Sequence, residues 1–159
     1  MTGTSGHRSI LKYRPQFDSI QEHNDCLIGN FKALVKKRDV TYFLGDMIFS
    51  YQSLELIQDL PGRKILVMGN HDLEERTLDT KLLYTAFEDV RSLVSKGGIW
   101  YSHAPIHPAE LRNKYNLHGH THYSSIGDDR YYNVCPEVND FKPIDVAIIK
   151  ETMRWVKQA

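Results

Sequence analysis

Four short segments rich in glycine, histidine and oxygen-bearing side chains constrain this chain most. They are Gly45-Asp46, Gly69-Asn70-His71-Asp72, Ser102-His103 and Gly119-His120-Thr121-His122. Half of the eight histidines fall in these segments, beside carboxylates and one amide. Nitrogen and oxygen ligands without thiolate suit a catalytic Zn, Mn or Fe ion better than a structural zinc site. The pattern therefore predicts a metal-dependent hydrolase.

Bulk composition predicts one ordinary globular domain spanning residues 1–159. Lys plus Arg and Asp plus Glu both number 20, so the formal net charge is zero. A neutral chain does not favour a nucleic-acid partner, although a local basic patch remains compatible with it. Cys26 and Cys135 are too far apart to form a metal-type pair and are expected to be reduced thiols. The sequence has no membrane-length apolar run and no hydrophobic signal core in residues 1–10, which predicts a cytoplasmic protein without a membrane partner.

Hydrophobic periodicity predicts an α/β fold in which helices and strands alternate. Ser19-Ile20-Gln21-Glu22 is typical of a capping box that opens a helix. We expect helices over residues 20–37, 53–60, 73–87 and 143–159, with a helical turn at 108–113. We expect strands over 40–44 and 64–68, a hairpin of 90–94 with 99–101, and strands over 115–117 and 130–135.

The motif residues come directly after predicted strands, and this placement brings them together. Asp46, Asn70, His103 and His120 each follow one strand. In sheets covered by helices, binding sites gather beyond the carboxyl ends of the strands. Residues far apart in the sequence can therefore share one site.

A two-metal phosphoester site assigns a role to each motif residue. Asp46 would bridge the two ions. Asn70, His103 and His120 would complete the ligand shell of one ion, and His122 would bind the other. Such ions activate water and polarise phosphoryl oxygens.

His71 has a separate role in this scheme. Imidazole can give a proton near neutral pH, so His71 is the candidate donor to the leaving oxygen. Asp72 would orient it.

Each motif taken alone has a simpler explanation. Gly-Asp after a strand is usually a turn, Gly-Asn-His-Asp suits a turn with a helix cap, and Ser-His is almost uninformative. Gly-His-x-His favours metal binding and an ordinary turn about equally. The four motifs in this order, each behind a predicted strand, favour a metal site.

The motifs resemble those of the calcineurin-like metallophosphoesterases, in particular the small single-domain bacterial and phage type. Gly6-His7 followed by Ile10 and Tyr13, and the stretch Tyr42-Phe43-Leu44-Gly45-Asp46, add to the resemblance. It implies a two-sheet mixed β-sandwich flanked by helices, a dinuclear centre, and hydrolysis of phosphomonoesters or phosphodiesters. It assigns the metal ligands and His71 as above, and places His7 at the substrate phosphate.

The start of the chain departs from this pattern. The family opens with a strand ending in Asp-x-His, which supplies two ligands to the first ion; those positions fall on Thr2 and Thr4 here. A hydroxyl is a weak ligand beside a carboxylate or imidazole. The N-terminal strand is thus expected to be truncated or absent, which would expose a sheet edge. We expect one complete site for Mn, Fe, Ni or Zn and an incomplete second site.

Three interpretations of the departure remain open. The chain is a shortened or altered form of an active enzyme, a natural one-metal variant with weak activity, or a degenerate relative that binds a protein partner without catalysis. For an enzyme, the small size and neutral charge favour a small phosphoester substrate. A generic phosphodiesterase assay with and without Mn separates catalysis from binding.

Overall fold

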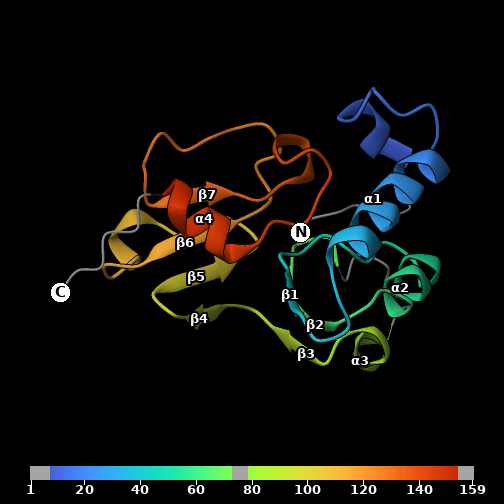
Figure 1. Ribbon diagram of the computed structural model, residues 1–159, viewed down its shortest axis with the longest axis horizontal. Helices are drawn as coiled ribbons and strands as arrows, with labels where there is room; N and C mark the ends of the chain where they lie inside the picture. The colour runs from blue at the N-terminus through green and yellow to red at the C-terminus, as the bar shows by residue number, and fades with distance from the viewer. Residues whose placement is uncertain (1–7, 73–78, 154–159) are drawn as a thin grey trace.

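Two β-sheets of unequal size lie side by side in the computed structural model, which describes residues 8–72 and 79–153 (Figure 1). The first sheet has the order β1-β2-β3, and the second has the order β4-β5-β6-β7. The strands are β1 (Val40–Phe43), β2 (Arg63–Val67), β3 (Asp89–Arg91), β4 (Val94–Lys96), β5 (Ile99–Ser102), β6 (Tyr115–His118) and β7 (Tyr131–Asn133). The expected mixed α/β architecture with two sheets is confirmed.

The first sheet is parallel throughout, and the second is mixed. In the first, Phe43 of β1 is opposite Leu66 of β2. In the second, β4 and β5 form an antiparallel hairpin across Gly97-Gly98, whereas β5, β6 and β7 run parallel. Parallel neighbours end at the same edge of a sheet, so the segments after β1 and β2, and those after β5 and β6, emerge in pairs.

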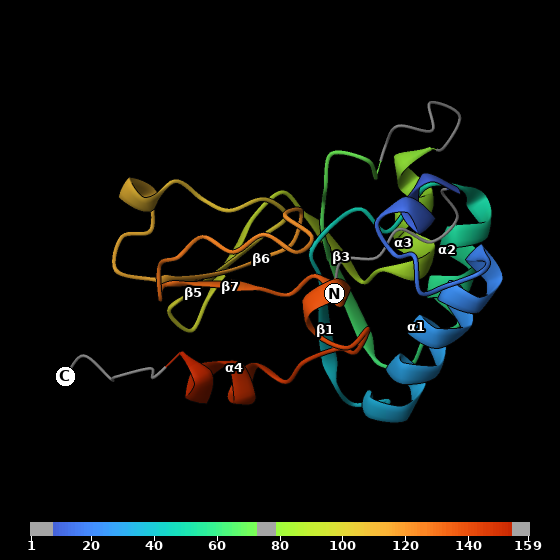
Figure 2. The same ribbon diagram turned by 90° about the horizontal axis from the view of Figure 1, so that it is seen from above.

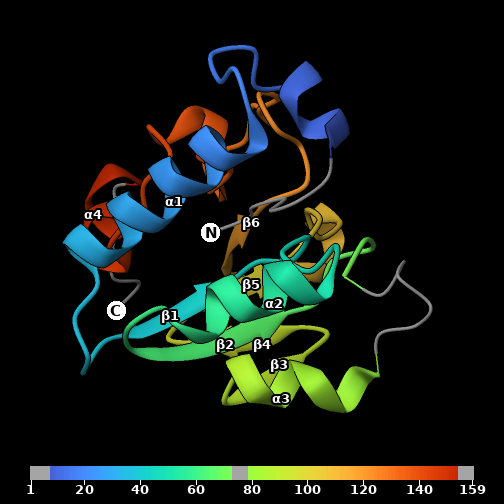
Figure 3. The same cartoon turned by 90° about the vertical axis from the view of Figure 1, so that its right-hand side faces the viewer.

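Of the four α-helices in the described residues, three cover the first sheet (Figure 2 and Figure 3). They are α1 (Ile20–Leu34), α2 (Tyr51–Gln58) and α3 (Leu83–Ala86), whereas α4 (Val146–Thr152) packs beside the second sheet. Short 3₁₀ turns complete the described chain, at η1 (Arg8–Lys12), η2 (Thr80–Leu82), η3 (Pro108–Glu110) and η4 (Pro136–Val138).

The alternation of side chains along β1 and β2 builds two cores. Phe43 and Leu66, both fully buried, face the core under the helices. The next residues, Leu44 and Val67, face the core shared with β5, β6 and α4. Successive strand residues point to opposite faces, and each such side chain contributes about 1.5–3 kcal/mol by leaving water. The strand ends that carry the motifs are therefore anchored from both sides.

Helix α1 begins as the sequence predicts. The hydroxyl of Ser19 accepts a hydrogen bond from the amide of Glu22 at 3.1 Å, and the Glu22 carboxylate accepts one from the amide of Asp18 at 2.8 Å. This pair satisfies two amides at the start of the helix, which would otherwise lack partners. Leu27 and Phe31 then face the core.

Some element boundaries differ from the prediction. The hairpin is formed by residues 94–96 with 99–102, while residues 89–91 form β3 and pair with β2 in the other sheet. Part of the helix expected over 73–87 lies outside the described residues, and its remainder is divided into η2 and the four-residue α3. The expected helix over 143–159 begins only after Asp145, whose carboxylate accepts a hydrogen bond from the amide of Ala147; its end also lies outside the described residues.

The open edge of β1 borders a groove of about 1030 Å³ that is lined by both apolar and polar residues. Within residues 8–72 and 79–153, β1 pairs only with β2. Four exposed aliphatic side chains line the groove: Leu34, Val40, Val138 and Ile148, which are 51%, 39%, 45% and 58% exposed.

The described helices contain none that is both long enough and apolar enough to cross a membrane. Cys26 and Cys135 are thiols and are not joined in a disulfide.

Candidate metal centre

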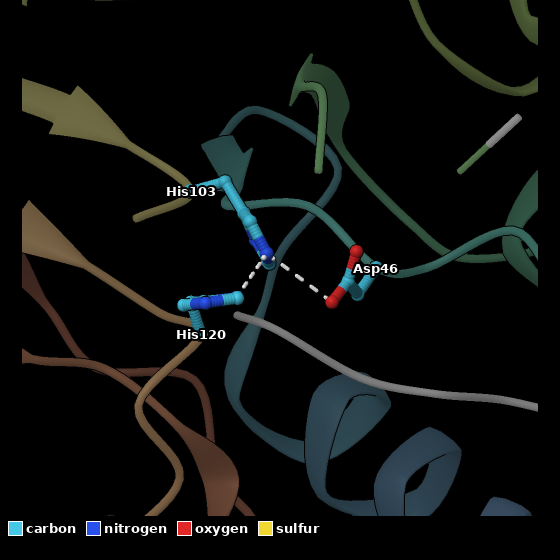
Figure 4. A group of neighbouring side chains, drawn as sticks. All are labelled: Asp46, His103 and His120. Atoms are coloured by element: carbon cyan, nitrogen blue, oxygen red, sulfur yellow. Dashed lines mark hydrogen bonds and ion pairs between the residues drawn. The ribbon is translucent and has the colours of Figure 1, made fainter. Parts of the chain in front are cut away.

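The loops that follow β1, β2, β5 and β6 meet between the two sheets. Asp46 and Asn70 each lie three residues beyond a strand of the first sheet, His103 comes directly after β5, and His120 lies two residues beyond β6. Asp46, His103 and His120 point toward one another (Figure 4). The predicted placement of the motifs after strands is therefore confirmed.

The Nε2 atom of His103 is the centre of this cluster. It lies 3.0 Å from Oδ1 of Asn70, 3.1 Å from Nδ1 of His120 and 3.2 Å from Oδ2 of Asp46. One ligand atom from each of Asp46, His103 and His120 lies within 4.8 Å of the others. A carboxylate, two imidazoles and an amide oxygen form a ligand set that a divalent transition metal accepts.

The hydrogen-bond partners of His103 favour a cation at this position. Its Nδ1 donates to the carbonyl of Leu44 at 2.8 Å, so the neutral ring carries no proton on Nε2. That bare nitrogen then faces two oxygen atoms that are also acceptors, those of Asn70 and Asp46. A positive charge among these atoms would stabilise such a convergence of acceptors.

Without a metal, a proton on His103 can supply that charge. Burial alone would lower the pKa of His103, but the hydrogen bonds to Asp46 and Leu44 and the charge of Asp46 raise it above its ordinary value. Burial likewise opposes ionisation of Asp46, yet His103 and the amide of His71 hold the pKa of Asp46 below its ordinary value. The site is therefore built to keep Asp46 anionic.

Asp46 is held in a fixed orientation by the neighbouring loop. Its Oδ1 accepts a hydrogen bond from the amide of His71 at 2.9 Å, which leaves Oδ2 directed at His103. The two loops of the first sheet thus fix the carboxylate before any ligand arrives.

Asp72 has a task that the sequence did not indicate. Its buried carboxylate accepts four backbone hydrogen bonds, from the amides of Asp46, Met47, Ile48 and Gly69 at 3.0, 2.6, 2.9 and 2.7 Å. Burial raises the pKa of Asp72 in spite of these donors. The carboxylate fastens the loop after β1 to the loop after β2.

Two glycines permit the close approach of these loops. Gly45 has a φ of +79°, and a Cβ there would lie 2.5 Å from the amide nitrogen of Gly69 and from Nδ1 of His103. A Cβ on Gly69 would lie 2.6 Å from the amide nitrogen of Asp46. Any larger residue would separate the ligands.

Three motif residues have a strained backbone. Asp46, His120 and His122 have φ values of 54°, 67° and 49°, in the left-handed region that non-glycine residues seldom occupy. Strain of this kind persists where surrounding contacts over-determine the backbone, and it is common at functional sites.

The remaining predicted site residues lie around this cluster. His71 is half-buried, with its ring centroid 5.8 Å from that of Phe49. His122 is outside the three-residue group; its Nδ1 lies 2.8 Å from the carboxylate of Glu137, and its ring stacks on Tyr13. His7 lies outside the described residues, as do Thr2 and Thr4.

Two further histidines are buried. Nδ1 of His118 lies 2.9 Å from the carbonyl oxygen of Gly119, a structural contact. His23 is fully buried against Arg14. The spacing of four residues between His23, Leu27 and Phe31 was the available signal, because it puts His23 on the buried face of α1.

Sequence reasoning missed Arg14 and Glu137. Both side chains are almost fully buried and form an ion pair of 2.9 Å across 123 residues. Arg14 precedes a proline and Glu137 follows one, a context typical of loops. No local pattern marks either residue as buried.

Comparison with known proteins identifies the family. The family model of the calcineurin-like phosphoesterases matches residues 14–158. An uncharacterized protein of Methanocaldococcus jannaschii is 29% identical over 161 residues, covering 90% of this chain and 82% of that protein. The Gene 66 protein of Mycobacterium phage L5 is 35% identical over 72 residues, covering 42% of this chain and 35% of that protein.

A crystal structure shows the same fold. It is that of a protein of unknown function from Aquifex aeolicus, with a TM-score of 0.74, 27% identity and 96% coverage of both chains. With its motif loops converging on Asp46 and His103, this chain belongs to the calcineurin-like phosphoesterase family of metal-dependent hydrolases.

Proposed function

We propose that the chain hydrolyses a small phosphoester with one divalent transition metal held by Asp46, Asn70, His103 and His120. The observation that carries the proposal is the position of His103 Nε2, which lies 3.0 Å from Oδ1 of Asn70 and 3.2 Å from Oδ2 of Asp46. Mn, Fe, Ni or Zn suits this ligand set. When bound, the ion would act as a Lewis acid on the phosphoryl group and activate the attacking water.

The residues of the chain itself do the rest. The amide of His71 is anchored on Asp46, so its imidazole leaves the backbone beside the ion site and would give a proton to the departing alkoxide. His122 would contribute to a second ion or to the substrate phosphate, and His7 would contact that phosphate. Asn70 and His120 are exposed, which supports access of a substrate from solvent.

The substrate we favour is a small phosphomonoester or phosphodiester. A formal net charge of zero gives no general attraction to a polyanion, so nucleic acid is the less favoured substrate.

The test is Mn-dependent hydrolysis of a generic aryl phosphodiester by the purified chain. We expect activity with Mn, none with EDTA, and a loss of at least about 100-fold in Asp46→Asn and His120→Ala. Asp129→Asn, an exposed carboxylate outside the cluster, is the matched control. Absence of Mn-dependent hydrolysis in the wild type would refute the proposed activity.

Metal binding is measured independently as a rise in Tm. An ion at 100 times its Kd stabilises the native state by about 2.7 kcal/mol. The shift should disappear in Asp46→Asn and remain in Asp129→Asn.

A second candidate is a non-catalytic protein that binds a partner. The threonines at positions 2 and 4, where the family has Asp-x-His, favour it. This candidate predicts no hydrolysis with Mn and a cellular function that survives Asp46→Ala.

A further inference from the structure

A buried ion pair lies behind His122, and the proposed mechanism does not use it. The side chain of Glu137 has no exposed surface, and that of Arg14 is 2% exposed. One carboxylate oxygen, Oε1 of Glu137, accepts from Nε of Arg14 at 2.9 Å and from Nδ1 of His122 at 2.8 Å. The carboxylate of this buried ion pair therefore contacts His122, whose side chain is 37% exposed.

The contact with Glu137 determines the proton arrangement of His122. An ionised carboxylate can only accept, so Nδ1 of His122 must carry the proton. In the neutral ring, Nε2 is then left with its lone pair. A histidine oriented by a carboxylate in this way is the usual arrangement for a metal-ligating or proton-accepting imidazole.

Other contacts hold the His122 ring and backbone in place. The ring stacks on Tyr13 with centroids 4.9 Å apart and an interplanar angle of 13°. Asn133 donates to the carbonyl of His122 at 2.7 Å, which supports its left-handed backbone. The hydroxyl of Tyr123 bonds to the carbonyl of Tyr13 at 2.9 Å and so supports the stacked ring. Little rotational freedom remains for His122.

The ion pair is also protected from neutralisation. Burial alone would raise the pKa of Glu137, but the Arg14 guanidinium and the bond from His122 hold it below its ordinary value. Arg14 in turn donates to Nε2 of His23, whose Nδ1 donates to Asn24 at 3.1 Å, so His23 is neutral. Burial and Arg14 lower the pKa of His23 to about 4. The network thus keeps one anion and one cation near neutral pH.

We propose that Glu137 is a positioning residue that holds His122 with Nδ1 protonated, so that the lone pair of Nε2 is available to the phosphoester site, and that Arg14 holds Glu137. The expected effect of Glu137 on hydrolysis rests on the proposed function, whereas the expected tautomer of His122 does not. A purely structural ion pair would anchor the loop at Arg14 to the turn η4 without any effect on His122.

The first test is ¹H–¹⁵N correlation of the histidine rings in the metal-free wild type, assigned with His122→Ala. We expect the Nδ1–H tautomer for His122. The Nε2–H tautomer in the wild type would overturn the inference without any further variant.

Glu137→Gln then removes the charge while keeping the shape. We expect it to shift His122 toward the Nε2–H tautomer and to lower kcat/KM by about 10- to 100-fold. In the His122→Ala background the same substitution should change kcat/KM by less than about twofold, because it acts through His122. Equal losses in both backgrounds, or an unchanged tautomer in a folded Glu137→Gln protein, would contradict the proposal.

Glu88→Gln is the matched control. Glu88 also pairs with an arginine, Arg63, but both side chains are at least half exposed. It should leave the His122 ring signals unchanged. If the wild type shows no hydrolysis with Mn, the proposed function fails, and the tautomer measurement still decides the role of Glu137.

Discussion

Replacement of Asp72 by alanine should disrupt the metal site through the backbone of the loops that carry its ligands. The carboxylate is fully buried and accepts four backbone hydrogen bonds from the two loops that carry Asp46 and Asn70. Asp72→Ala removes the acceptor and leaves four amides without it.

The structure gives the size of the effect. An amide left buried without a partner costs about 1–3 kcal/mol, so four would cost about 4–12 kcal/mol. Water entering the vacated space would satisfy some of them, and we expect a loss of about 4 kcal/mol. Since domains are stable by only about 5–15 kcal/mol, this is a large fraction of the total.

Asp72→Asn separates charge from shape. The amide oxygen can serve one pair of donors, while its NH₂ group faces the other pair. A loss of about 2 kcal/mol, roughly half of the alanine effect, is therefore expected. Asp25→Ala, an exposed residue of α1, is the control and should stay within about 0.5 kcal/mol of the wild type.

The assay is urea unfolding followed by circular dichroism, with Mn affinity measured by calorimetry. Asp72→Asn should bind Mn about 10- to 100-fold more weakly than the wild type, because the loops lose their alignment. If Asp72→Ala unfolds within 1 kcal/mol of the wild type and binds Mn equally well, the reasoning is wrong.

Three further predictions follow from the same geometry. Gly69→Ala should weaken Mn binding by at least about 10-fold, because a Cβ would push into the Asp46 loop; Gly29→Ala, where a Cβ meets nothing within 4 Å, should not. The pKa of His23 falls from 6.5 to about 4 on folding, so the native state binds fewer protons. The free energy of unfolding should therefore decrease by up to about 3 kcal/mol as pH falls from 6.5 to 4; urea unfolding in EDTA should show a smaller decrease for His23→Gln. His71→Gln should lower kcat by about 10²- to 10⁴-fold while leaving the Mn-induced rise in Tm intact, and a simultaneous loss of that rise would contradict its role as a proton donor.

The positions of the motifs were predictable because their signals are local. A run of β-branched and aromatic residues followed by Gly45-Asp46, or by Gly69-Asn70, indicates a strand that ends at a sharp turn. The order of the motifs then places both loops at one edge of the sheet. The capping box at Ser19 was predictable for the same reason, because its signal lies within a few residues.

Other features depend on contacts distant in sequence. Residues 89–91 join β2 rather than the adjacent hairpin, a choice that their own sequence does not encode. Asp72 looked like a partner for its neighbour His71, whereas loop closure gives it the amides of residues 46–48 and 69. Glu137 becomes significant only when Arg14 and His122 are brought beside it.

The central claim is that Asp46, Asn70, His103 and His120 hold a divalent metal. Anomalous diffraction from a crystal grown with Mn tests it most directly. The account predicts a peak between these four residues, about 2.0–2.3 Å from their ligand atoms, which disappears in Asp46→Asn. If a crystal grown with saturating Mn shows no peak at this position, or a peak only elsewhere, the account is contradicted.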